Sequence, residues 1–313
     1  MLTHLVIANP ASGRGLGARR RREAERLLDA GGLAYEVFVT RAGGDARRVA
    51  REEAARYSVI VALGGDGTIQ EVAGGLAEAR LARAAEDTRP LAALGILPAG
   101  TGNDLIKSLR LPADFAAACR RLCAGQPRAL DLGRMRWREV GEAAPRERLF
   151  VNNVGLGFEG QVGWAAYRLR LPLRGLPLYL IALLKVLVRL ESPRLALAWD
   201  GVEAPPRPLL LVSVGNGSTS GGGFRLNPRA NPCDGRLDVC AADARGRLEI
   251  LRLLPRAMKG THLDLPGIES RRVARLSVRG ETPFAGHADG ELLSERILAA
   301  EFEVLPGLLP AIF

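Results

Sequence analysis

The feature that most constrains this chain is an apolar run that leads directly into a glycine-rich turn. Val59–Leu63 contains only apolar residues, and Gly64-Gly65-Asp66-Gly67-Thr68 follows at once. A short apolar run is typical of a strand in a parallel sheet, because helices cover both faces of such a sheet. The turn then lies at the carboxyl end of the strand, where open α/β sheets bind their ligands.

Strand and helix patterns alternate through the first third of the chain, and strand patterns dominate after about Asp131. The alternation predicts an α/β N-terminal domain with an open parallel sheet. The later strands predict a mostly β sandwich as the C-terminal domain. We place the domains at residues 1–130 and 131–313, with the last residues able to return to the first domain.

Two further glycine-rich turns follow predicted strands of the first domain. They are Asn9-Pro10-Ala11-Ser12-Gly13-Arg14-Gly15 and Pro98-Ala99-Gly100-Thr101-Gly102-Asn103-Asp104. Glycine lets backbone N–H groups crowd a phosphate, and a following helix adds its positive end. A carboxylate such as Asp66 suits this place only with Mg²⁺ or a ribose hydroxyl between it and the phosphate. Helix capping by Thr68, Asn103 or Asp104 is the alternative for each turn taken alone.

The composition of the chain limits which binding partners and which cellular compartment are expected. The net charge is +10, which favours anionic partners such as nucleotides and acidic lipid headgroups. Nucleic acid is not expected, because no nucleic-acid-binding motif occurs. The start of the chain lacks the pattern of a secretory signal. The longest apolar stretch, Tyr179–Leu190, includes Lys185 and Arg189 and is too short to span a bilayer. Four cysteines without a C-x-x-C pattern favour a reduced, cytoplasmic protein.

Several common catalytic motifs are missing from the sequence. It contains no G-x-x-x-x-G-K-[ST], no protein-kinase H-R-D or D-F-G set and no G-x-S-x-G. The three histidines, His4, His262 and His287, are scattered, and each is interpreted as structural. Phosphates would therefore be held by backbone amides, Mg²⁺ and arginine.

The three turns, taken with motifs further along the chain, resemble the bacterial soluble lipid kinases of the diacylglycerol kinase catalytic-domain family. That family shares a superfamily with sphingosine, ceramide and NAD kinases. The later motifs are Asp131-Leu132-Gly133, Asn153-Val154-Gly155-Leu156-Gly157-Phe158, Asn216-Gly217, Gly221-Gly222-Gly223-Phe224, Asp234-Gly235-Arg236-Leu237-Asp238 and Asp289-Gly290-Glu291. The resemblance covers nearly the whole chain in order.

The resemblance implies a nucleotide cleft between the domains and a set of site residues. Asp66, Asp104 and Asp131 match acidic positions of an Asp–water–Mg²⁺ network, and Asp289 matches the general base. A second, structural Mg²⁺ matches Asn231, Asp234 and the carbonyl of Arg236; the family often has an acidic residue where Asn231 stands. The matched ATP-binding positions, together with Asn103, are Asn9, Pro10, Ala11, Ser12, Gly13, Thr40, Gly65, Asp66, Gly67, Thr68, Ile69, Gln70, Glu71 and Thr101.

The predicted function is an ATP- and Mg²⁺-dependent lipid kinase, with diacylglycerol favoured as the acceptor and phosphatidic acid as its product. Monoacylglycerol, sphingoid bases, ceramide and phosphatidylglycerol remain open. The alternatives are an NAD kinase, in which an Asn-Glu pair would be expected where Asn103-Asp104 stands, and a catalytically silent nucleotide- or lipid-binding module. The protein is expected to be cytoplasmic and peripherally membrane-associated, and a homodimer is left open. Leu171–Leu190, with Arg170, Arg174, Lys185 and Arg189, is either an interfacial element or a helix packed on the β domain.

Overall fold

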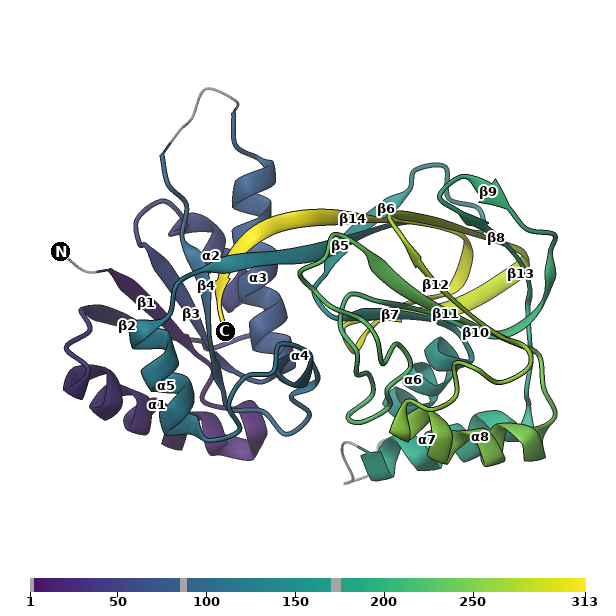
Figure 1. The fold of residues 1–313 in the computed structure, drawn as a ribbon, viewed down its shortest axis with the longest axis horizontal. Helices are drawn as coiled ribbons and strands as arrows, with labels where there is room; N and C mark the ends of the chain where they lie inside the picture. Colours follow the sequence, from purple (N-terminus) through teal and green to yellow (C-terminus); the bar gives the residue numbers. More distant parts are fainter. Residues whose placement is uncertain (1–2, 85–88, 170–175) are drawn as a thin grey trace. The chain divides into compact units, whose positions relative to one another are not determined.

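The computed structural model describes residues 3–84, 89–169 and 176–313, and the chain divides into two compact units (Figure 1). The first unit holds Met1–Asp131 and Pro306–Phe313, and the second holds Leu132–Leu305. The helices and strands confirm an α/β domain followed by a β-rich domain. The division lies one residue after the predicted boundary, and residues 306–313 return to the first unit. The nucleotide cleft stays a prediction.

The first unit is built on a parallel sheet in the strand order β2, β1, β3, β4 and the end of β14. β1 and β3 are buried along their whole length, as their apolar sequences require. Helices α1 and α5 share one hydrophobic cluster with alternate residues of β1 and β3, so they cover one face. The strands are β1 (His4–Ala8), β2 (Tyr35–Val39), β3 (Val59–Gly64), β4 (Ala93–Pro98) and β14 (Glu291–Ile312). The helices are α1 (Ser12–Ala30), α2 (Asp45–Glu52), α3 (Asp66–Leu81), α4 (Asp104–Ser108) and α5 (Phe115–Ala124).

The second unit is an antiparallel sheet that curls around its own core. β7 pairs with β10 and β13, and β8 pairs with the same two strands, so these four strands form a ring. The strands of the predicted sandwich are therefore connected in one network. The strands are β5 (Arg128–Glu139), β6 (Arg146–Phe150), β7 (Asn153–Gly157), β8 (Arg194–Trp199), β9 (Val202–Glu203), β10 (Arg207–Gly215), β11 (Leu237–Asp243), β12 (Ile268–Val273) and β13 (Arg275–Ala288).

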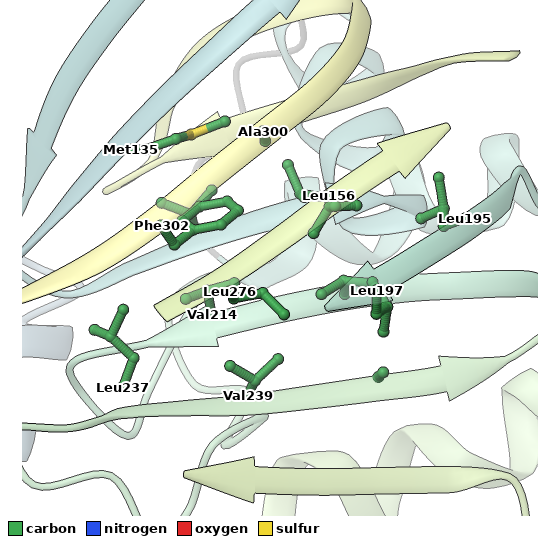
Figure 2. Close-up of a cluster of buried hydrophobic side chains, with 14 of the residues drawn as sticks. Met135, Leu156, Leu195, Leu197, Val214, Leu237, Val239, Leu276, Ala300 and Phe302 are labelled. Atoms are coloured by element: carbon green, nitrogen blue, oxygen red, sulfur yellow. The ribbon is translucent and has the colours of Figure 1, made fainter. Parts of the chain in front are cut away.

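Two apolar layers stabilise the second unit. Figure 2 shows the inner layer, in which side chains from several strands, among them Leu156, Leu197, Val214 and Phe302, meet inside the curled sheet. The outer layer joins the opposite side of β10 and β11 to three helices, α6 (Phe158–Arg168), α7 (Leu176–Val188) and α8 (Arg247–Lys259). Among the residues with described placement, no helix combines the length and apolar character needed to cross a membrane.

Candidate active site

The three glycine-rich turns of the first unit lie at one edge of its sheet, after β1, β3 and β4. Backbone hydrogen bonds hold them in register: the N–H of Asn9 donates to the carbonyl of Leu63, and that of Ala99 to the carbonyl of Gly64. Gly65 and Gly100 meet backbone to backbone, and a Cβ on Gly100 would lie 2.6 Å from the Cα of Gly65. The glycines are therefore needed for the turns to approach each other.

Asn9 organises the first turn. Its Nδ2 donates to Oγ1 of Thr68 at 3.1 Å, and its Oδ1 accepts from the N–H of Ala11 at 3.0 Å. Ser12 Oγ donates to the carbonyl of Asn9 at 2.8 Å. The next three residues, including Arg14 with φ 62°, have left-handed backbone and break α1 after its first residue. A non-glycine residue in this region is strained, a condition common at functional sites.

Asp66 links the second turn to the third. Its Oδ1 accepts from the N–H of Leu105 at 3.3 Å, so its side chain caps α4 while its backbone begins α3. Burial raises the pKa of Asp66, and the nearby charge of Asp104 raises it further, against the effect of the N–H groups at the start of α4. The structure thus brings the carboxylates of Asp66 and Asp104 together beside two helix N-termini.

These residues fit a magnesium ion accompanied by nucleotide phosphates. Asp104 is 8% exposed, with Lys107 Nζ at 3.3 Å from its Oδ1. Oδ1 of the neighbouring Asn103 is buried without a hydrogen-bond partner, and Asn103 has φ 53°. Carboxylate and amide oxygens are the donors that Mg²⁺ prefers. No cluster of three or more His, Cys, Asp or Glu side chains that could hold a metal occurs within residues 3–84, 89–169 and 176–313. Phosphate oxygens would therefore have to complete the ligand set.

Three of the predicted nucleotide or metal positions make structural contacts, and their roles at the site stay predictions. Ile69 is fully buried, so its side chain packs in the interior. The carboxylate of Glu71 accepts from the N–H groups of Gly44 at 3.1 Å and Ala46 at 3.2 Å, at the start of α2. Asp131 is 2% exposed and accepts from the N–H of Gly307 at 2.7 Å, which holds the returning segment to the first unit.

The other predicted positions of the first unit divide between interior and surface. The side chains of Thr68 and Gln70 are buried, and Thr40 bonds to the carbonyl of Ala8. Gly67 and Thr101 are exposed at the tips of the second and third turns. Pro10, Gly13 and Gly65 are half-buried, and Ala11 is exposed. At the edge of the sheet where the three turns lie, the residues exposed to a ligand are therefore mainly those at the tips of the turns.

Asp289 lies in the turn between β13 and β14 of the second unit. Asp289 and Gly290 have φ of 49° and 81°, as a two-residue hairpin turn with two left-handed residues requires. The carboxylate accepts from the N–H groups of Val151 at 2.8 Å and of Asn152 and Asn153 at 2.9 Å each. Burial raises the pKa of Asp289 against the opposing effect of these N–H groups. β6 ends at Phe150 and β7 begins at Asn153, because the N–H groups of residues 151–153 turn toward Asp289.

A buried polar cluster beside Asp289 is absent from the sequence prediction. Oε1 of Glu159 accepts from Ser220 Oγ at 2.7 Å and from Asn153 Nδ2 at 3.3 Å, and His287 Nε2 lies 3.2 Å away. Burial alone raises the pKa of Glu159, but His287 and Ser220 outweigh it, so the pKa lies below its ordinary value. The sequence feature that could have indicated this cluster is the position of Glu159, directly after Gly155-Leu156-Gly157-Phe158 and in the first turn of α6.

Glu159 and Ser220 form the polar end of an apolar slot. The slot has a volume of about 90 Å³ and lies between the sheet and the inner sides of α7 and α8. Oε2 of Glu159 is buried without a hydrogen-bond partner. The apolar lining comes mainly from Phe158, Val162, Tyr179, Leu183, Leu210, Ile250 and Leu254.

The residues predicted for a structural Mg²⁺ fit a metal ion poorly. Asp234 is the only carboxylate among them; its Oδ1 accepts from the N–H of Arg236 at 3.1 Å, and its Oδ2 forms an ion pair with Arg272. Asn231 is exposed and neutral. A guanidinium of the chain itself thus neutralises Asp234, and we assign no metal role to Asn231, Asp234 or Arg236.

Chelation of divalent cations is therefore expected to leave the stability of the ATP-free protein unchanged. The midpoint of thermal unfolding should shift by less than about 2 °C with excess EDTA, because roughly 1 kcal/mol moves it by at least that much in a unit of this size. The measurement is calorimetry with EDTA and with Mg²⁺. A clear drop in EDTA that Mg²⁺ restores would show that the second unit holds a structural metal after all.

Comparison with known proteins finds relatives of both units. The family model described as the diacylglycerol kinase catalytic domain matches residues 3–135, and that of the YegS C-terminal NAD kinase beta sandwich-like domain matches residues 152–313. A diacylglycerol kinase of Mycobacterium tuberculosis is 31% identical over 307 residues, covering 97% of this chain and 93% of the relative.

Solved structures share the fold of both units. A crystal structure of a diacylglycerol kinase from Bacillus anthracis matches with a TM-score of 0.70 at 22% identity, over 100% of this chain and 97% of that one. The yeast NADH kinase in complex with NADH matches with a TM-score of 0.54 at 12% identity, over 99% of this chain and 82% of that one. With both family models matched in order and a relative similar over almost its full length, the chain belongs to the diacylglycerol kinase catalytic-domain family.

Proposed function

We propose that this chain is a lipid kinase that transfers the γ-phosphate of ATP to the hydroxyl of diacylglycerol. The observation that carries the proposal is the apolar slot whose polar end leads to Asp289. Glu159 at the slot bonds to the side chain of Asn153, and the backbone N–H of Asn153 bonds to Asp289. At about 90 Å³ the slot takes only a short part of a hydrocarbon chain, and a ligand bound there would place its polar end at this cluster. An apolar lining suits an acyl chain and offers little to a dinucleotide.

The proposed roles follow the needs of phosphoryl transfer. The turns after β1, β3 and β4 hold the phosphates. Asp66, Asp104 and Asn103 would hold Mg²⁺, which would supply neutralisation of the phosphate charge. The lipid hydroxyl loses its proton to the carboxylate of Asp289, and its oxygen bonds to the γ-phosphorus. The bond from that phosphorus to the β–γ bridging oxygen breaks, and ADP leaves. Positioning and charge neutralisation supply most of the catalysis in such reactions.

A panel of acceptors with labelled ATP tests this function. We expect phosphatidic acid to form from diacylglycerol in mixed micelles, with no labelled product from NAD. Monoacylglycerol, ceramide and a sphingoid base belong in the same panel, because all carry a hydroxyl beside a hydrocarbon chain. Labelling of NAD in place of every lipid would make the chain an NAD kinase, and no labelling of any acceptor would favour a silent binding module.

A further inference from the structure

The outer side of α7 is an apolar stripe on which no described part of the chain packs. The helix contains one charged residue, Lys185, and its inner side packs in the layer beneath the sheet. Ile181, Leu184 and Val188 are 38%, 53% and 67% exposed. Their spacing of three and four residues places them on one side of the helix. Three large apolar side chains aligned in this way mark an interaction surface better than scattered ones do.

α8 continues the same apolar surface. Leu248 and Leu251 are 69% and 37% exposed and lie three residues apart. A guanidinium N–H of Arg247, at the start of α8, donates to the carbonyl of Val188, at the end of α7, at 2.8 Å. α7 and α8 lie on the same side of the second unit (Figure 1), and their inner residues line the same apolar slot. The exposed stripes therefore lie on the far sides of the two helices that enclose the slot.

The border of this surface is strongly basic. Lys185 and Arg189 belong to α7 and its end, and Arg252 and Arg256 belong to α8; all four are exposed. Within the described parts of the chain, none of the four takes part in an ion pair, whereas many other arginines do. The one acidic residue of α8, Glu249, accepts from the N–H of Gly246 and closes the start of the helix. The charge is thus available to an external anion.

We infer that this surface is the membrane-docking face of the protein and that its occupant is a bilayer of anionic lipids. The docking face consists of Ile181, Leu184, Val188, Leu248 and Leu251, bordered by Lys185, Arg189, Arg252 and Arg256. Apolar side chains that enter the acyl boundary, together with basic residues at headgroup level, are the pattern of an interfacial helix. The inference rests on the proposed function in one respect: if the acceptor is a membrane lipid, docking would bring that lipid next to the slot.

A second copy of the chain fits this face less well than a membrane does. In a two-fold symmetric contact the same patch meets itself, so the four unpaired cations of one copy would face those of the other. Like charges brought together in this way oppose association. An anionic headgroup layer offers the opposite charge. Arg170 and Arg174, which the sequence predicts in the same interfacial stretch, lie outside the described residues.

Vesicle binding in the absence of ATP tests the docking face. The protein is mixed with vesicles of phosphatidylglycerol and phosphatidylcholine, or of phosphatidylcholine alone, and the bound fraction is measured by flotation. Leu184→Gln with Leu251→Gln should weaken binding roughly ten-fold or more, because two inserted side chains are lost. Lys185→Gln with Arg252→Gln should weaken binding to the anionic vesicles by about five-fold per residue, and less at high salt.

Matched controls come from the strands of the same unit. Val202→Gln with Leu298→Gln removes two exposed apolar side chains, and Arg138→Gln with Arg279→Gln removes two exposed arginines. Both control pairs should bind vesicles like the unaltered protein. Equal loss in controls and docking-face variants, or unchanged binding by the docking-face variants, would overturn the inference. A docking-face variant that binds vesicles normally but no longer dimerises in sedimentation would also overturn it, in favour of a second copy.

Kinase activity on a short-chain diacylglycerol dissolved in detergent separates the two proposals. The docking-face variants should keep this activity, because the acceptor no longer has to be taken from a bilayer. Normal vesicle binding by the unaltered protein without activity on any lipid would refute the proposed function and leave the docking face standing. Activity in detergent with unchanged vesicle binding by the variants would refute the docking face alone.

Discussion

Asp289→Asn is expected to lower kcat for lipid phosphorylation by about 10²–10⁴-fold while leaving ATP affinity little changed. An alcohol is a weak nucleophile at neutral pH, and general-base catalysis is typically worth about this much. Burial holds the pKa of Asp289 above its ordinary value, which suits a carboxylate that must accept a proton. Since the base must be ionised to act, the activity of the unaltered protein should fall as the pH is lowered through that raised pKa. The residual activity of Asp289→Asn should not show this fall at low pH.

The structure adds a stability effect that has to be separated from catalysis. Oδ1 of Asp289 can be replaced by the amide oxygen of asparagine, but the amide nitrogen would then face the N–H of Val151. An unsatisfied buried donor costs about 1–3 kcal/mol of stability. Thermal unfolding of the variant is therefore measured beside its kinetics, and kcat is expressed per folded molecule.

Glu291→Gln is the matched control for Asp289→Asn. Glu291 lies two residues away on the same hairpin, and its side chain is 53% exposed where it pairs with Arg148, so its removal should cost little. If Asp289→Asn keeps most of its kcat, or loses activity only in proportion to folded protein or ATP binding, the carboxylate is structural. Glu159, with its unpartnered oxygen at the slot, would then be the next residue to test as the base.

Asp66→Asn is expected to lower kcat by about 10²–10³-fold while the protein stays folded. The amide oxygen can still accept from the N–H of Leu105 and cap α4, but the charge beside Asp104 is lost. Removal of one preorganised electrostatic group typically costs about 10²–10³ in kcat. Asp66→Ala removes the cap as well and should in addition destabilise the protein by roughly 1 kcal/mol. Turnover, ATP affinity by calorimetry and thermal unfolding are measured on both variants.

Asp114→Asn controls for capping as such. Oδ2 of Asp114 accepts from the N–H of Ala117 at 2.7 Å at the start of α5, in the same unit and outside the three turns in the sequence. The substitution keeps an acceptor and removes a charge, as Asp66→Asn does, yet turnover should remain normal. Near-normal turnover of a folded Asp66→Asn protein would remove Asp66 from the nucleotide site.

The first unit was predictable because its signals are local. Val59–Leu63 is apolar throughout because both faces of β3 are covered, and the glycines at positions 65 and 100 mark the close approach of two turns. The interior position of Ile69 and the capping by Glu71 were not predicted. A motif shows which residues occur together, whereas burial depends on which side of α3 meets the sheet.

The second unit was harder to predict because its site depends on contacts between distant residues. Asp289-Gly290 is recognisable as a hairpin turn, but its contact with three N–H groups at residues 151–153 joins segments more than 130 positions apart. The same holds for Glu159, which meets Ser220 and His287 only in the folded sheet. The position of Arg272 beside Asp234 likewise follows from the pairing of β12 with β11.

The path of β14 has a consequence for how the chain folds during its synthesis. Ala311 and Ile312 pair in parallel with Leu94 and Gly95 of β4, so a strand of the first unit comes from residues that follow the entire second unit in the chain. Domains generally fold in the order in which they leave the ribosome. Here the nascent first unit must wait, with one side of β4 unpaired, until translation has passed residue 312. The unpaired edge of β4 could pair with a strand of another chain. We therefore expect a chaperone to bind the unfinished protein.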